Sequence, residues 1–345
     1  MSGTDQRYDV VVIGGGAAGL SGALALSRAR RSVLVIDAGS PRNAPAAHAH
    51  NYLGREGVPP LELLAIGRGE AAGYGAEIVQ GRAVSAEKLP DGFRVVQEDG
   101  STVHARRLLV TTGIVDELPA VEGLAERWGR EVLHCPYCHG WEVRDRPVGV
   151  LALSPMAVHQ ALLWRQWTDD VVLFRDGRPD FTDEEYEQLA ARGVSVVDGE
   201  VTALEITEDR VTGVRLAGGK VIPREALVVQ PRFTARSAVL ESLGLVPTEM
   251  VMGDHVIGTY VAADPAGATD VPGVWVAGNV ANLMEQVVGA AAAGLKAASM
   301  INMDLVTDDT RRAVEARRAP FSADAERQVT ERVLGDRRHG LQEMR

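Results

Sequence analysis

The sequence predicts an α/β protein with two three-layer domains, the second of which is inserted in the first. Residues 8–37 have the pattern of a strand, a glycine-rich turn, a helix and a second strand. The same pattern begins again at residue 148. Near the end of the chain, residues 273–279 (GVWVAGN) predict a late strand that ends in a tight turn. Strands that alternate with helices in this order are typical of two Rossmann-like domains with parallel sheets.

The overall composition narrows the class of protein. A chain of 345 residues with 46% hydrophobic residues can bury two cores of ordinary size. Its net charge of -11, from 36 Lys+Arg against 47 Asp+Glu, leaves no broad basic surface for nucleic-acid phosphates. The polar residues 1–7 lack the apolar core of a secretion signal, and no apolar run is long enough to span a bilayer. We therefore expect a cytoplasmic protein with no nucleic-acid and no membrane partner.

The first βαβ unit carries the pattern of a dinucleotide site. Its strand is followed by residues 14–19 (GGGAAG) and by an Ala/Leu-rich helix that ends near Arg31. Gly14 and Gly16 allow a tight turn and a close approach to a pyrophosphate, which the N–H groups of the helix N-terminus then stabilise. Asp37 ends the next strand, where its carboxylate can accept hydrogen bonds from a ribose. The alternative is a glycine turn that only packs a helix on a sheet. Such a turn would not require the full order of strand, glycine turn, helix, strand and acidic residue.

The remaining segments suggest where the domains divide. Residues 107–113 predict a strand that leads to a crossing between domains. The second unit has a strand at 148–153, a helix at 156–167 and strands at 170–174, 194–197, 201–206, 211–216 and 226–229. A small-residue helix over 286–301 returns the chain to the first domain. We therefore expect a first domain formed by residues 1–116 and 248–306, an inserted domain at 117–247, and a charged extension at 307–345 that is solvated or forms a dimer contact.

The cysteines are the most informative feature of the sequence. Residues 134–140 (HCPYCHG) place two residues between Cys135 and Cys138. This spacing allows a disulfide if a helix begins at Cys135, and the helix N-terminus would lower the pKa of that thiol. His134 and His139 can titrate near neutral pH and could move protons to and from thiols, with His139 the first choice. A zinc site would need further ligands at matching spacing, and inert core cysteines are the other alternative. We predict a redox-active pair and no metal site.

Together these motifs resemble the low-molecular-weight thioredoxin reductase family over roughly residues 8–305. The resemblance implies that FAD binds the first domain, that Cys138 faces the flavin while Cys135 meets the substrate, and that the chain forms a homodimer. It also implies that Gly14, Gly16 and Gly19 hold the pyrophosphate, Asp37 the adenosine ribose, and Asn51, Gly278 and Asn279 the flavin end. Gln286 and Val287 would face the flavin, and further cofactor-binding residues would be Ala17, Ala18, Ala38, Val84, Thr112 and Gly113.

Three departures from the family pattern bear on function. Asn279 stands where an Asp is usual, and His139 stands where the reductases carry an Asp as proton donor. In the second βαβ unit the family's GxGxxA becomes residues 152–157 (ALSPMA), so both glycines are absent and Pro155 lacks an N–H for a phosphate. Residues 174–176 (FRD) offer one arginine beside a carboxylate instead of a cluster for a 2′-phosphate. NAD(P)H should therefore bind poorly.

With these departures the chain resembles the dithiol oxidases of the gliotoxin and holomycin types, which close disulfides in small natural products. The likeness implies a small-molecule dithiol or disulfide as substrate, with two electrons passing through the cysteines and FAD to O2 to give H2O2. The nearest alternative is an NADPH-dependent reductase of a thioredoxin-like protein. A flavin-bound redox sensor or self-protection protein, which binds a reactive disulfide without turnover, is an alternative of another class.

Two histidines remain unassigned. His48 and His50, in residues 46–54 (AAHAHNYLG), belong by the family likeness to a segment that runs past the flavin. One of them could assist substrate deprotonation, although a loop histidine is more often exposed or bound structurally. Trp164 and Trp167 share a face of the predicted helix, which favours packing over a substrate contact.

Overall fold

The computed structural model describes residues 7–177, 180–318 and 323–334 of the chain. Its first domain contains a seven-stranded sheet in the order β3-β2-β1-β6-β5-β4, with β19 also paired to β6. These strands are β1 (Arg7–Ile13), β2 (Val33–Asp37), β3 (Glu77–Gln80), β4 (Ala83–Leu89), β5 (Gly92–Gln97), β6 (Thr102–Val110) and β19 (Val274–Val276). Strands β1, β2, β3, β6 and β19 run parallel, whereas β4 and β5 pair antiparallel.

The central strands of this sheet are apolar on both faces, and each face has its own core. Val10 and Val12 pack with helices α1 and α7, whereas Val11 and Ile13 point to the opposite face and pack with α6. An uninterrupted apolar run is what a parallel strand covered on both sides requires. The helices of this domain are α1 (Ala17–Arg28), α2 (Pro60–Gly73), α6 (Ala238–Glu241), the 3-10 turn η2 (Gly278–Val280) and α7 (Val287–Arg318).

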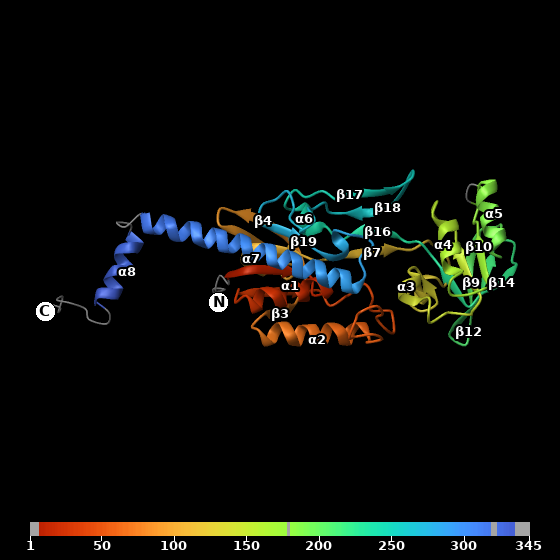
Figure 1. The fold of residues 1–345 in the computed structure, drawn as a ribbon, viewed down its shortest axis with the longest axis horizontal. Helices are drawn as coiled ribbons and strands as arrows, with labels where there is room; N and C mark the ends of the chain where they lie inside the picture. The colour runs from red at the N-terminus through yellow and green to blue at the C-terminus, as the bar shows by residue number, and fades with distance from the viewer. Residues whose placement is uncertain (1–6, 178–179, 319–322, 335–345) are drawn as a thin grey trace.

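A second sheet lies where the chain passes between the domains (Figure 1). It has the order β17-β18-β16-β7 and consists of β7 (Ile114–Glu117), β16 (Arg232–Ala235), β17 (Thr248–Met252) and β18 (His255–Tyr260). Strand β7 leaves the first domain, and β16 returns beside it in antiparallel pairing. Val239 and Leu240 of α6 then join the core of the first sheet. These contacts favour a return to the first domain at β16, earlier than the expected residue 248.

The inserted domain repeats the α/β pattern, as the sequence predicts. Its parallel sheet has the order β11-β10-β9-β15-β8, and an antiparallel sheet of β12, β13 and β14 covers one face. The strands are β8 (Val132–Leu133), β9 (Val148–Leu151), β10 (Val171–Phe174), β11 (Ser195–Val197), β12 (Val201–Thr207), β13 (Arg210–Leu216), β14 (Val221–Pro223) and β15 (Ala226–Val228). The helical segments are η1 (Ala125–Arg127), α3 (Pro136–His139), α4 (Ala157–Trp164) and α5 (Asp183–Ala191).

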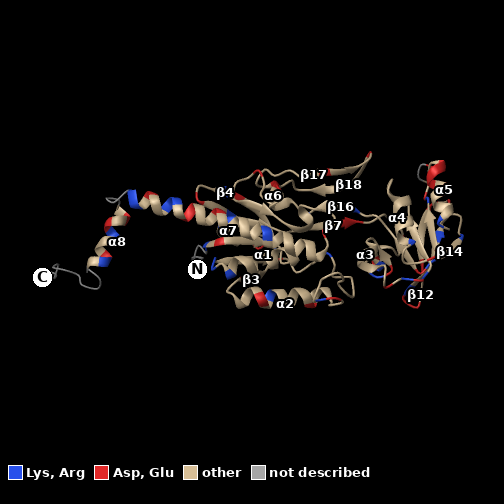
Figure 2. Ribbon diagram, in the orientation of Figure 1, with Lys and Arg blue, Asp and Glu red and all other residues tan. Residues whose placement is uncertain are grey.

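Helix α7 differs from its predicted length. The sequence predicts a helix over 286–301, but α7 continues without a break to Arg318 and projects beyond the first sheet (Figure 1). The charged residues that suggest a solvated extension are partly engaged, because Asp308 pairs with Arg106 at 2.9 Å and Asp309 with Arg31 at 2.8 Å. Helix α8 (Ala323–Leu334) follows, and charges of both signs are spread over this end of the molecule (Figure 2). No helix among the described residues has the length and apolar character to cross a membrane.

Candidate active site

A single large cavity joins the glycine turn of the first domain to the cysteine pair of the second. Its volume is about 1090 Å³, at the upper end of the usual range for ligand pockets. The first domain contributes the turn at 14–18 and residues of the loop at 40–50, and the inserted domain contributes residues 132–139 and one side of α4. One long ligand could therefore contact both predicted sites.

The glycine turn leaves space for a pyrophosphate where the sequence predicts it. Gly14 has φ +107°, and a side chain there would clash with the backbone of Thr111. A Cβ on Gly19 would overlap the carbonyl of Gly14, so this glycine allows close packing and does not line the cavity. Gly16 lines the cavity, and a Cβ there would meet nothing within 4 Å. The turn therefore fits the phosphates of FAD at Gly16.

Asp37 stands at the end of β2, as expected for a ribose contact, and it is held from two sides. Its Oδ1 accepts a hydrogen bond of 3.1 Å from the backbone N–H of Gly15. Its Oδ2 pairs with Arg68 of α2 at 2.6 Å. Arg68 is not recognisable from the sequence, because it lies 31 residues away on another element. Asp37 and Ala38 both line the cavity.

The predicted cofactor residues separate into two groups. All but two line the cavity, namely Gly14, Gly16, Ala17, Ala18, Asp37, Ala38, Val84, Thr112, Gly113, Gly278, Asn279, Gln286 and Val287. Gly19 and Asn51 are not among its lining residues. Asn51 is exposed, and its side-chain N–H donates to the carbonyl of Tyr137 at 2.7 Å. Its position indicates that Asn51 holds the helix of the cysteines, a role that the family likeness does not imply.

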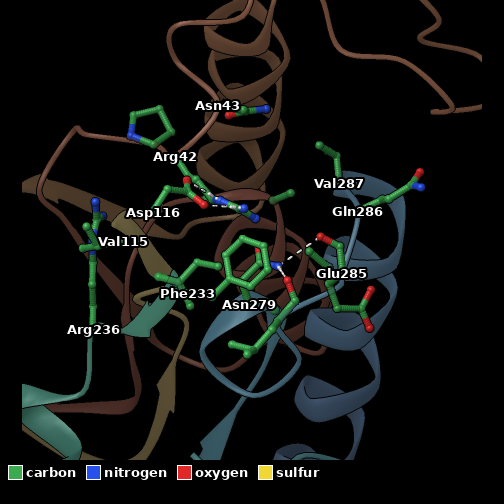
Figure 3. Close-up of a pocket in the computed structure, with 18 of the residues that line it drawn as sticks. Arg42, Asn43, Val115, Asp116, Phe233, Arg236, Asn279, Glu285, Gln286 and Val287 are labelled. Atoms are coloured by element: carbon green, nitrogen blue, oxygen red, sulfur yellow. Dashed lines mark hydrogen bonds and ion pairs between the residues drawn. The ribbon is translucent and has the colours of Figure 1, made fainter. Parts of the chain in front are cut away.

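The amide of Asn279 holds the loop that leads into α7. Its Nδ2 donates to the backbone carbonyls of Asn282, Leu283 and Glu285 at 3.2, 3.2 and 3.0 Å. Figure 3 shows the side chain turned toward Glu285. A carboxylate has no N–H and could not make these bonds. The loop conformation therefore explains why an amide, in place of the family's Asp, occupies this position.

Cys135 and Cys138 line the same cavity. Cys135 is the N-cap of α3, and its carbonyl accepts hydrogen bonds from the N–H groups of Cys138 and His139, both at 3.1 Å. The two Sγ atoms are 2.6 Å apart. A hydrogen bond from Cys138 lowers the pKa of the Cys135 thiol to about 7, against the opposing effect of burial. The same contact together with burial raises the pKa of Cys138. Cys135 is therefore the first of the pair to ionise.

His134 is packed tightly and does not titrate near neutral pH. Burial, together with the charge of Arg42, lowers the pKa of His134 to about 4. Its ring packs edge-on against Phe233 with 5.2 Å between centroids, and its Nδ1 has no hydrogen-bond partner among the described residues. This result differs from the expectation that both histidines titrate near neutrality. The difference arises from burial, which disfavours the charged imidazole and cannot be read from sequence.

His139 is less enclosed than His134. Burial lowers its pKa, whereas the carboxylate of Glu142 raises it. No hydrogen bond engages the His139 ring within the part of the chain that the structure describes. His139 lines the cavity beside both cysteines. It is the better placed of the two histidines to exchange protons with a thiol.

Arg42 and Asp116 form an ion pair near the cysteines that the sequence does not predict. Nε and Nη2 of Arg42 donate to Asp116 at 2.8 and 2.6 Å, and the Asp116 side chain is only 8% exposed. The guanidinium lies 5.1 Å from the centroid of Phe233 (Figure 3). Its positive charge favours the thiolate forms of Cys135 and Cys138 and lowers the pKa of each to some extent. Arg42 and Asp116 are 74 residues apart, so their pairing depends on the fold.

Two donors at the second nucleotide site are engaged within the protein. The N–H of Met156, at the start of α4, donates to Ser154 Oγ at 3.3 Å. Arg175, at the end of β10, pairs with Asp198 and, at 3.2 Å, with Asp180. The N–H of Met156 and the guanidinium of Arg175 are therefore not free to bind an NADPH phosphate. Ser154 and Met156 instead line the same cavity as the cysteines.

Two other predictions concern groups near the cysteines. Trp164 is fully buried in the core of the inserted domain, as a packing residue should be. Trp167 lies beyond the end of α4 and packs against Tyr137, with 5.6 Å between ring centroids. Among the described residues no group of three or more His, Cys, Asp or Glu is arranged to hold a metal ion.

Comparison with known proteins identifies the family. Residues 8–294 match the family described as pyridine nucleotide-disulphide oxidoreductase. This chain belongs to that family. It is 32% identical over 323 residues to the thioredoxin reductase sirT of Leptosphaeria maculans, covering 88% of this chain and 95% of the relative. It is 30% identical over 325 residues to the thioredoxin reductase tcpT of Claviceps purpurea, covering 88% and 96%.

Solved structures agree with this assignment. The crystal structure of HlmI matches with a TM-score of 0.83 and 45% identity, over 91% of this chain and 97% of that one. An oxidoreductase from Agrobacterium tumefaciens matches with a TM-score of 0.81 and 36% identity, over 88% and 99%. The predicted fold class and the resemblance to thioredoxin reductase-like flavoproteins are confirmed. The protein is an FAD-dependent thiol–disulfide oxidoreductase, and its cavity fits the cofactor at the Gly16 turn.

Proposed function

We propose that this family member is a dithiol oxidase that forms a disulfide in a small-molecule dithiol, with O2 as the electron acceptor and H2O2 as the product. The observation that carries the proposal is the shared cavity, which is lined by both the cysteine pair and the glycine turn. In contrast, the N–H of Met156 and the guanidinium of Arg175 at the second nucleotide site are engaged within the protein. The substrate class follows the likeness to oxidases of the gliotoxin and holomycin type.

The cysteines and His139 account for the exchange chemistry. A substrate thiolate attacks Sγ of Cys135, the Cys135–Cys138 bond breaks, and Cys138 leaves as a thiolate. The second substrate thiolate then attacks the substrate sulfur of the mixed disulfide and releases the Cys135 thiolate. His139 accepts the proton from each substrate thiol, since it lines the cavity with both cysteines and burial favours its neutral form. Bound FAD supplies the capacity to accept the two electrons and transfer them to O2.

The direction of electron flow is tested without air. A dithiol such as dithiothreitol should bleach the flavin, and admitting air should restore its colour with one H2O2 formed per dithiol oxidised. Rapid, saturable bleaching by micromolar NADPH would instead support the reductase, the alternative that the names of the curated relatives favour. If neither the dithiol nor NADPH bleaches the flavin, the protein is a flavin-bound binding or sensing protein and not an oxidase or a reductase.

The division of labour between the cysteines is tested by single replacements. Cys135→Ser should leave a Cys138 thiolate against oxidised FAD, visible as a long-wavelength absorption band, whereas Cys138→Ser should show none. The reverse pattern would exchange the two roles. Full activity in both variants would mean that neither thiol carries electrons.

We also infer a homodimer, from the family likeness, and a cytoplasmic location, from the sequence. Each inference can be tested by a direct measurement. Light scattering after size exclusion should give twice the chain mass of 36.8 kDa. Cell fractionation should recover the protein with soluble cytoplasmic markers, and a monomer or a membrane-bound pool would count against them.

A further inference from the structure

The loop at residues 48–57 of the first domain is fixed against the helix that carries the cysteines. Asn51 donates to the carbonyl of Tyr137 at 2.7 Å, and its own backbone N–H donates to Glu56 at 2.8 Å. Asn51 has φ +61°, in the left-handed region where an L residue is held only by its surroundings. These contacts bring the neighbouring histidine, His50, to the cavity beside the cysteines.

His50 lies between two carboxylates that reach solvent. Its Nδ1 is 2.6 Å from Oε1 of Glu56, and its Nε2 is 3.3 Å from Oε1 of Glu142. The His50 side chain is 18% exposed, whereas Glu56 is 65% and Glu142 is 38% exposed. Imidazole can accept a proton at one ring nitrogen while it releases one from the other, so this arrangement connects a half-buried position to water.

Glu142 also links His50 to His139. Glu142 follows His139 by three residues in the chain and contacts His50, and His50 and His139 line the same cavity. The charge of Glu142 favours the protonated form of His139, and the charge of His50 opposes it. The other group that faces His50 is His48, with 6.2 Å between ring centroids. Nδ1 of His48 is instead 2.9 Å from the carbonyl of Gly57, and among the described residues His48 has no carboxylate partner. The two loop histidines therefore have different surroundings.

We propose that His50, held between Glu56 and Glu142, carries protons between His139 and solvent during dithiol oxidation. The proposal rests on the oxidase function, in which a dithiol and O2 yield a disulfide and H2O2. Each dithiol gives up two protons and two electrons when its S–H bonds break and its S–S bond forms. His139 holds one proton at a time, so it must release the first before it can accept the second. The two protons return when O2 is reduced to H2O2. His50 acts through His139 and is thus a positioning residue.

The test compares His50→Gln with His48→Gln in the FAD-loaded protein. Dithiothreitol is mixed anaerobically with each variant, and the rate of flavin bleaching is followed by stopped-flow absorbance from pH 5.5 to 8.5. His50→Gln should slow bleaching about tenfold, because a relay supplies only part of the usual effect of acid–base catalysis. It should also change the shape of the pH profile. Added imidazole should restore most of the rate, and His48→Gln should stay within about twofold of the wild type.

Other outcomes distinguish this inference from the oxidase function. Equal rates and pH profiles for His50→Gln and His48→Gln would overturn the relay while leaving the oxidase intact. A slow His50→Gln that imidazole does not rescue would mean that His50 only supports the loop, and would also overturn it. If His50→Gln does not fold, Glu142→Gln interrupts the same link and should show the same loss with an unchanged flavin spectrum. A wild type that no dithiol bleaches would refute the oxidase, and the relay with it.

Discussion

Replacing Asn279 by Asp gives a sharp test of how the loop before α7 is held. The two N–H groups of the amide serve three backbone carbonyls at 3.0 to 3.2 Å. Two net hydrogen bonds at about 1 kcal/mol each suggest that Asn279→Ala costs about 2 kcal/mol of the free energy of unfolding. Asn279→Asp loses the same bonds and adds a carboxylate facing carbonyl oxygens, for a total of about 3–4 kcal/mol.

Thermal unfolding followed by circular dichroism measures the effect. At roughly 2–4 °C per kcal/mol, Asn279→Ala should lower Tm by roughly 4–8 °C, and Asn279→Asp should lower it further and reduce the bound flavin. Asn302→Asp is the matched control, since the Asn302 side chain accepts a hydrogen bond from Arg31 and a carboxylate can do the same. If Asn279→Asp matches the wild type in Tm or retains more FAD, the amide is not needed as a donor and the reasoning is wrong.

Three further predictions concern the cofactor, the cysteines and the long helix. Gly16→Leu should fold normally but purify with little FAD, because the new side chain enters open space in the cavity. Gly19→Ala should instead lose stability, because its Cβ clashes with the backbone. Full flavin retention in Gly16→Leu would refute this placement of the FAD site. In the reduced protein, iodoacetamide should modify Cys135 first, and the pH dependence of the reaction should have its midpoint near the Cys135 pKa of about 7. Cys138→Ala should raise that midpoint. Peptide mass mapping that finds Cys138 modified first would contradict this order. Asp308→Asn should cost roughly 1–3 kcal/mol at pH 7 by chemical denaturation. Burial opposes ionisation of Asp308, but hydrogen bonds from Arg106 and other arginines hold its pKa below its usual range. The stabilisation by Asp308 is therefore complete above the ordinary Asp pKa and is lost as the pH falls through the pKa of Asp308 in the folded protein. A pH-independent difference between Asp308→Asn and the wild type would contradict this.

Much of the fold could be predicted because its signals are local. Residues 10–13 of β1 and 148–151 of β9 are continuous apolar runs, and each strand is followed by a helix of the expected kind. The end of α7 could not be predicted in this way. Its charged residues have the pattern of a solvated extension, and only the fold places Arg31 and Arg106 where Asp308 and Asp309 can reach them.

Those parts of the site that depend on neighbouring residues could be predicted from the sequence. Glycines at 14 and 16 form the turn, and the Cys-x-x-Cys spacing places two thiols at the start of one short helix. The charges that surround the thiols depend on the three-dimensional fold. Arg42 reaches Asp116, and His50 reaches Glu142, across large sequence separations. Burial then separates the two flanking histidines, because the cost of charging an imidazole depends on how much water surrounds it, and that is a property of the packed protein.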